Sequence, residues 1–96
     1  MEVKWNRSAI RDLKKIHDFI KVDSAFYGAK VMADILDASQ GLAKFPKLGR
    51  IVLGTSRPET REIFIYSYRL IYRVHENVVR VLVLVHSRRD FDPAEF

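Results

Sequence analysis

The residues of this chain best suited to chemistry on a phosphate group are four cationic or titratable side chains in its last third. Arg69 lies within an alternating apolar stretch, and His86, Arg88 and Arg89 end the next such stretch. Metal-free cleavage of RNA needs a base for the 2′-hydroxyl, cations around the phosphorane and an acid for the leaving oxygen. Histidine can transfer the protons and arginine can clamp the phosphate. A metal-independent endoribonuclease is therefore one hypothesis for this chain.

Each of these residues also has a structural explanation. Arg69 can form an inter-strand or C-terminal salt bridge, for example to Asp90 or Asp92, and His86 can be a hydrogen-bonded residue at a strand end. The sequence leaves open whether the chain is an enzyme, and it favours a protein that acts by binding.

Two strand patterns flank a turn that we centre on Glu76-Asn77, because Asn tolerates positive φ. This turn predicts four cross-strand pairs: Val74 with Val79, Tyr72 with Val81, Leu70 with Val83 and Tyr68 with Val85. All these side chains are apolar or aromatic, so we assign them to the core. A different turn length would exchange the two faces.

The opposite face of the hairpin combines cations with aliphatic residues. Its members are Arg69, Ile71, Arg73, Arg80, Leu82, Leu84 and His86. Arg73 falls opposite Arg80, and a chain tolerates such like charges more readily when an acidic partner binds. Apolar positions rimmed by cations suit an amphipathic acidic segment. With Arg88 and Arg89, these residues are the predicted binding site, which we expect the first strand or the tail to cover only in part.

The remaining elements must support this hairpin. A short strand is predicted at Glu2–Trp5, an antiparallel helical hairpin over 8–44, a short strand within 50–53 and another over 61–66. In the second helix, one face is predicted to hold the residues Ala25, Ala29, Met32, Leu36 and Ala43, with Val31, Ile35 and Leu42 beside it. The order β-α-α-β-β-β predicts an α+β domain with both helices on one face of a mainly antiparallel sheet of about four strands.

Composition limits the function classes. The 96 residues predict a single domain over 1–96, with a net charge of +5 and a pI near 9.7, which suit an acidic partner or nucleic acid. The chain has no cysteine, no signal-like start and no bilayer-spanning run, and we expect a cytoplasmic protein without a membrane partner. Three scattered histidines form no metal-ligand set, and no phosphate-binding glycine loop indicates a cofactor.

Five short segments, in their order and spacing, resemble the RelE/ParE superfamily of type II toxin–antitoxin toxins, and the ParE branch most. They are Val3-Lys4-Trp5, Phe45-Pro46-Lys47-Leu48-Gly49-Arg50, Arg61-Glu62-Ile63, Tyr68-Arg69-Leu70-Ile71-Tyr72-Arg73-Val74 and Val85-His86-Ser87-Arg88-Arg89-Asp90. The resemblance implies a toxin of a plasmid-stabilisation system, neutralised by an acidic antitoxin of the ParD or RelB kind, with DNA gyrase as the target. The alternative that it implies is a RelE-like, ribosome-dependent mRNA endonuclease that uses Arg69, His86 and Arg88 or Arg89.

Two departures count against the nuclease alternative. RelE-type toxins carry lysines in the strand before Arg69, where this chain has Arg61, Glu62 and apolar residues. They also place a catalytic tyrosine after the last strand, where this chain has Phe91 and Phe96. A carboxylate before Arg69 would oppose phosphate binding unless it turns away. The resemblance therefore favours the gyrase-binding hypothesis.

Overall fold

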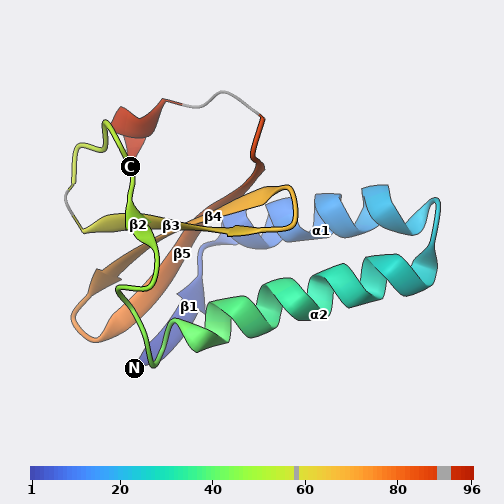
Figure 1. The fold of residues 1–96 in the computed structure, drawn as a ribbon, viewed down its shortest axis with the longest axis horizontal. Coiled ribbons are helices and arrows are strands. Elements are labelled where there is room, and N and C mark those ends of the chain that lie inside the picture. Colours follow the sequence, from blue (N-terminus) through green and yellow to red (C-terminus); the bar gives the residue numbers. More distant parts are fainter. Residues whose placement is uncertain (58, 89–91) are drawn as a thin grey trace.

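A helical hairpin covers one face of a five-stranded sheet in the computed structural model of the protein, which describes residues 1–57, 59–88 and 92–96 (Figure 1). The elements are β1 (Glu2–Trp5), α1 (Arg7–Lys21), α2 (Ala25–Gly41), β2 (Arg50–Ile51), β3 (Thr60–Ile65), β4 (Tyr68–His75), β5 (Val78–His86) and the 3-10 helix η1 (Pro93–Glu95). The predicted α+β architecture is confirmed, and the sheet has one more strand than the predicted four. Neither α-helix among the described residues has the length and apolar character needed to cross a membrane.

The two helices pack closely where glycine allows it. Ser24 begins α2, and its Oγ accepts a hydrogen bond from the backbone N–H of Tyr27 at 3.0 Å. A Cβ at Gly28 would lie 3.2 Å from Cδ2 of His17, so the close approach of α1 and α2 depends on this glycine. The hairpin extends beyond the sheet at its turn (Figure 1).

In α2, the residues placed beside the predicted face are the more deeply buried ones. The buried residues of this helix are Gly28, Val31, Ile35 and Ser39, whereas Ala25 and Ala29 are exposed and Leu36 retains 43% exposure. Apolar residues occur on two adjacent sides of the helix, and the position of α2 on the sheet decides which side is buried.

The sheet has the order β1-β5-β4-β3-β2, in which β1 runs parallel to β5 and the other neighbours are antiparallel. Glu76 and Asn77 both have positive φ, of 49° and 62°, so the predicted turn is confirmed. The pairs Val74 with Val79 and Tyr72 with Val81 form as predicted, and Arg73 lies opposite Arg80.

A β-bulge changes the pairing beyond Tyr72. Ile71 pairs with Val83, Leu70 with Leu84 and Tyr68 with His86, so Leu82 is the extra residue of β5. The predicted pairs of Leu70 with Val83 and of Tyr68 with Val85 are therefore wrong. A one-residue shift moves every later side chain to the other face of a strand.

Two apolar clusters lie on the two faces of the sheet. The larger, under the helices, is formed by Ala9, Val31, Ile35, Leu42, Leu70, Tyr72, Val79, Val81 and Leu84. The smaller consists of Val52, Ile71 and Leu82, against which Val83 and Phe96 pack. We call the side of the sheet that carries this smaller cluster the open face. Phe96 of the C-terminal tail covers part of this face, as predicted.

Candidate binding site on the open face

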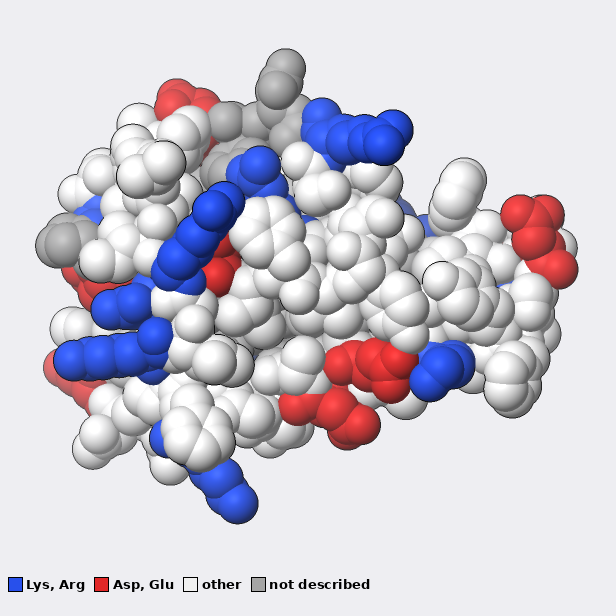
Figure 2. Space-filling model, in the orientation of Figure 1, with Lys and Arg blue, Asp and Glu red and all other residues white. Residues whose placement is uncertain are grey.

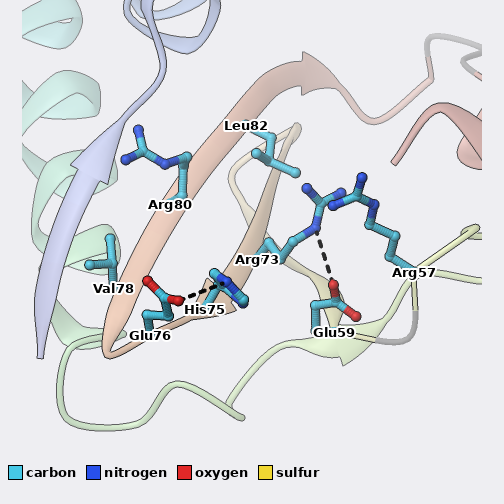
Figure 3. A pocket seen from close by; sticks show the side chains of 8 residues that line it. All are labelled: Arg57, Glu59, Arg73, His75, Glu76, Val78, Arg80 and Leu82. Carbon is cyan, nitrogen blue, oxygen red and sulfur yellow. Dashed lines mark ion pairs between the residues drawn. The ribbon is translucent and has the colours of Figure 1, made fainter.

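Three arginines gather around a cavity of about 340 Å³ on the open face (Figure 3). Its lining residues are Arg57, Glu59, Arg73, His75, Glu76, Val78, Arg80 and Leu82. β4 supplies Arg73, β5 supplies Arg80, and the loop before β3 supplies Arg57. The turn at Glu76-Asn77 and the pairing next to it therefore position two of the three arginines.

Arg73 is the most enclosed of these cations. Its Nε lies 3.9 Å from Oε1 of Glu59, and its Nη2 donates to the carbonyl oxygen of Phe96 at 3.3 Å and is 3.4 Å from Oγ1 of Thr60. Burial lowers the pKa of Arg73, and the nearby charge of Arg57 lowers it further, while Glu59 acts in the opposite direction. The guanidinium stays charged at neutral pH all the same. An added carboxylate would relieve the repulsion between these arginines.

A second cationic group surrounds a buried carboxylate. The Glu62 side chain is only 4% exposed, and its Oε1 accepts from Nε of Arg50 at 2.9 Å. Nη1 of Arg69 lies 4.0 Å from Oε2 of Glu62. Both guanidinium groups also approach the Phe64 ring, at 5.0 Å for Arg50 and 5.5 Å for Arg69. Arg69 therefore has a structural ion pair with Glu62. Asp90, which was predicted as a salt-bridge partner of Arg69, lies outside the described residues.

His86 lies on the side of the helices, away from Arg69. Its ring packs edge-on against Tyr68 at 5.7 Å, and its Nδ1 accepts from the backbone N–H of Arg88 at 3.1 Å. It lines a cavity of about 250 Å³ with α1 residues that include Asp12 and Phe19. Arg69 pairs across the ladder with Val85, one residue before His86. The predicted placement of Arg69 and His86 on one face is therefore wrong.

The other predicted binding residues separate into three groups. Leu84 was expected on the open face but is buried under the helices, and its N–H donates to Oδ2 of Asp12 at 3.1 Å. Ile71 and Leu82 do lie on the open face, where both are buried. Arg88 is exposed, and Arg89 lies outside the described residues.

The sequence-based site omits the partners that hold the arginines. Arg57, Glu59 and Thr60 come from a loop and a strand start without any periodic signal. The contact of Glu62 with Arg69 could have been predicted from the sequence, because a two-residue connection from β3 to β4 puts both side chains on the same face.

Positive charge dominates the strand-and-loop part of the molecule. Ten Lys or Arg stand against three Asp or Glu between Lys44 and Arg89. Figure 2 shows basic side chains gathered over this part, on the left, and a broad uncharged surface that continues toward the helices. Such a distribution attracts acidic segments and polyanions.

Comparison with known proteins identifies the family. The model of the ParE toxin of type II toxin–antitoxin systems, parDE, matches residues 3–91. The chain belongs to this family. The toxin is 26% identical over 88 residues to Toxin RelE2 of Caulobacter vibrioides, a match that covers 92% of this chain and 97% of that protein. It is thus a RelE/ParE superfamily toxin of the type II class.

Solved structures confirm the fold of this ParE-family toxin. The chromosomal ParDE system from P. aeruginosa superposes with a TM-score of 0.74 at 23% identity, covering 90% of this chain and 95% of that one. The isolated E. coli RelE toxin gives a TM-score of 0.68 at 18% identity, covering 98% and 92%. Since ParE and RelE proteins share the fold, it does not distinguish their targets.

Proposed function

We propose that this toxin acts by binding DNA gyrase, in the manner of ParE-type toxins, and does not cleave RNA. The main support for this proposal is that His86 and Arg69 lie on opposite sides of the sheet. A general acid or base must lie within hydrogen-bonding reach of the reacting atoms. The cavity beside Arg69 is lined by Arg50, Val52, Leu53, Glu62, Arg69 and Pro93, so the ionised groups that share it with Arg69, within the described part of the chain, are a carboxylate and another arginine.

The neutralising partner in this proposal is a cognate acidic antitoxin of the ParD or RelB kind. Its carboxylates would enter the cavity formed around Arg57, Arg73 and Arg80, where the three arginines outnumber two glutamates, Glu59 and Glu76. Arginine suits this role because its planar donors can bind a carboxylate in a bidentate manner. Leu82 lines the same cavity and can contact the antitoxin there, whereas Ile71 is fully buried in the cluster against which Phe96 packs.

The gyrase contact is assigned to the basic end of β5. His86 and Arg88 are exposed there, and Arg89 follows in sequence. This assignment leaves the open face to the antitoxin. The toxin would then have separate surfaces for gyrase and for the antitoxin.

Induction of the toxin in cells tests the proposal. The expected result is a supercoiling defect and DNA-damage signalling, with inhibition of purified gyrase in a supercoiling assay. Rapid ribosome-linked cleavage of mRNA that disappears in Arg69→Ala or His86→Ala would instead establish the RelE-like activity and overturn the proposal. An expression-matched Arg11→Ala variant, altered on the exposed side of α1, serves as the control.

A further inference from the structure

The β-bulge in β5 is held by side chains of α1. Oγ of Ser8 donates to the carbonyl oxygen of Leu82, the extra residue of the strand, at 3.1 Å. On the other side of the bulge, the N–H of Leu84 donates to Oδ2 of Asp12 at 3.1 Å. A bulge interrupts the ladder, and buried backbone groups rarely stay unpaired. Ser8 and Asp12, one helical turn apart, therefore fix the end of β5 against α1.

A cavity of about 250 Å³ lies beside this contact, between α1 and the end of β5. It is lined by Asp12, Lys15, Ile16, Phe19, Tyr68, Leu84, Val85 and His86. The four residues from α1 recur at helical spacing, so they form one side of that helix. Pockets for drug-sized ligands usually measure about 300 to 1,000 Å³, so this smaller cavity suits a single side chain of a partner protein.

Phe19 is the most exposed apolar residue that lines the cavity. Its side chain is 76% exposed, and it lies in the last turn of α1, where the helical hairpin extends beyond the sheet (Figure 1). Aromatic side chains are enriched in protein–protein interfaces, and a few of them contribute most of the binding energy. A partner side chain in the cavity would remove part of the Phe19 ring from water.

Proton donors and a cation border the apolar part of the cavity. Lys15 forms no ion pair among the described residues, whereas its neighbour Lys14 is held by Asp18 at 3.3 Å. His86 accepts a backbone N–H at Nδ1, so Nε2 is the donor of its neutral ring. The carboxylate of Asp12 already accepts a backbone N–H of β5. A partner with a carboxylate next to an apolar side chain matches this set of groups.

We propose that this cavity accepts an apolar side chain of gyrase, and that a neighbouring carboxylate of gyrase pairs with Lys15 and His86. The inference rests on the proposed gyrase target, whose contact is assigned to the same end of β5, and it names the chemistry of the gyrase residues that bind there. Phe19 then determines specificity for gyrase. The antitoxin binds elsewhere, because the arginine cavity proposed for it lies on the other side of the sheet.

Two alanine variants test the inference. Phe19→Ala removes the ring beside the cavity, and Val22→Ala changes a residue that is 81% exposed and lies outside the cavity lining. In a supercoiling assay, the toxin concentration that half-inhibits purified gyrase is expected to rise about tenfold or more in Phe19→Ala and to stay near the wild-type value in Val22→Ala. Calorimetric titration with the purified antitoxin should give the wild-type Kd for both variants.

The other results are distinguishable. A wild-type toxin that does not inhibit gyrase overturns the proposed function together with the inference. Equal inhibition by wild type and Phe19→Ala overturns the inference alone. Equal losses in Phe19→Ala and Val22→Ala would indicate a general contact of the hairpin turn, and weaker antitoxin binding by Phe19→Ala would assign the cavity to the antitoxin. Both of these results overturn the inference.

A charge variant covers the case in which Phe19→Ala loses its circular dichroism signature. Lys15→Gln neutralises the cation beside the cavity, and Lys14→Gln makes the same change one residue earlier, outside the lining. Weaker inhibition of gyrase is expected in Lys15→Gln only. The same inhibition by both variants would overturn the inference.

Discussion

The hydroxyl of Tyr72 holds the backbone of the segment from Phe45 to Arg50, and its position helps to explain why glycine occupies position 49. It donates to the carbonyl oxygen of Pro46 at 2.7 Å and accepts from the N–H of Gly49 at 2.9 Å. A Cβ at position 49 would lie 2.6 Å from the carbonyl oxygen of Glu62, so only glycine fits. One buried tyrosine therefore holds the loop that leads into β2.

Tyr72→Phe is expected to lower the free energy of unfolding by about 1–3 kcal/mol, because two backbone groups lose their buried partner. Urea denaturation monitored by tryptophan fluorescence measures the change. Tyr68→Phe is the matched control on the same strand, and a smaller effect is expected there because the Tyr68 ring is only partly buried. Equal losses in both variants would show that the Tyr72 hydrogen bonds contribute no stability of their own.

Glu62 is the residue that counterbalances Arg50 and Arg69. Glu62→Gln keeps the shape and removes the charge, so we expect a loss of about 1–3 kcal/mol in unfolding free energy and later elution from heparin. Glu76→Gln makes the same charge change at an exposed site and controls for net charge. Elution at the same salt concentration for both variants would show that the buried carboxylate does not mask the arginines.

At the scale of elements, a hydrogen bond and a ring contact between Tyr27 and Tyr66 at 6.2 Å tie α2 to the turn between β3 and β4. The hydroxyl of Tyr66 donates to Oδ2 of Asp34, and Tyr66 adopts a positive φ of 55°. This hydrogen bond lowers the pKa of Asp34 from its ordinary 3.8, with a further contribution from Lys30, and raises the pKa of Tyr66 to about 12. This hydrogen bond is therefore lost at low pH, where Asp34 becomes protonated, and at high pH, where Tyr66 loses its proton.

Tyr66→Phe tests this link. A carboxyl whose pKa is lower in the folded than in the unfolded state stabilises the protein above the unfolded value and loses that contribution as pH falls. The stability difference between wild type and Tyr66→Phe should thus be full at pH 7 and decline below pH 3.8. It should also decline as pH rises from the ordinary Tyr value of 10 toward about 12. In an Asp34→Asn background the acid decline should vanish; its persistence would assign it to another carboxyl.

At the scale of the whole molecule, the sheet separates two kinds of surface. One side is covered by helices, and the other collects arginines over a small apolar cluster partly covered by Phe96. Antitoxin binding to this second side would be largely electrostatic in its rate and specificity.

Salt dependence measures that contribution. The Kd of the antitoxin complex should rise with salt, and Arg73→Gln combined with Arg80→Gln should both weaken binding and flatten the dependence. Arg11→Gln, on the exposed side of α1, should leave the slope close to that of wild type. A slope that is the same in all three proteins would place the antitoxin away from the open face.

Much of the architecture was predictable because its signals are local. The two strands β4 and β5 and the Asn-containing turn between them each depend on neighbours in sequence, and both the strands and the turn are confirmed. The sequence left open which side of α2 is buried, because two apolar sides compete and only packing on the sheet selects one.

For the candidate site, the sequence by itself determined which residues carry charge and that Arg73 meets Arg80, since that pair lies close to the turn. Only the tertiary structure decided where His86 and Leu84 point, because one extra residue in β5 turns both toward the helices. It also decided that Arg69 faces the buried Glu62. A bulge leaves no mark in an alternating apolar stretch, and yet it separates the histidine from the arginine that a nuclease would need beside it.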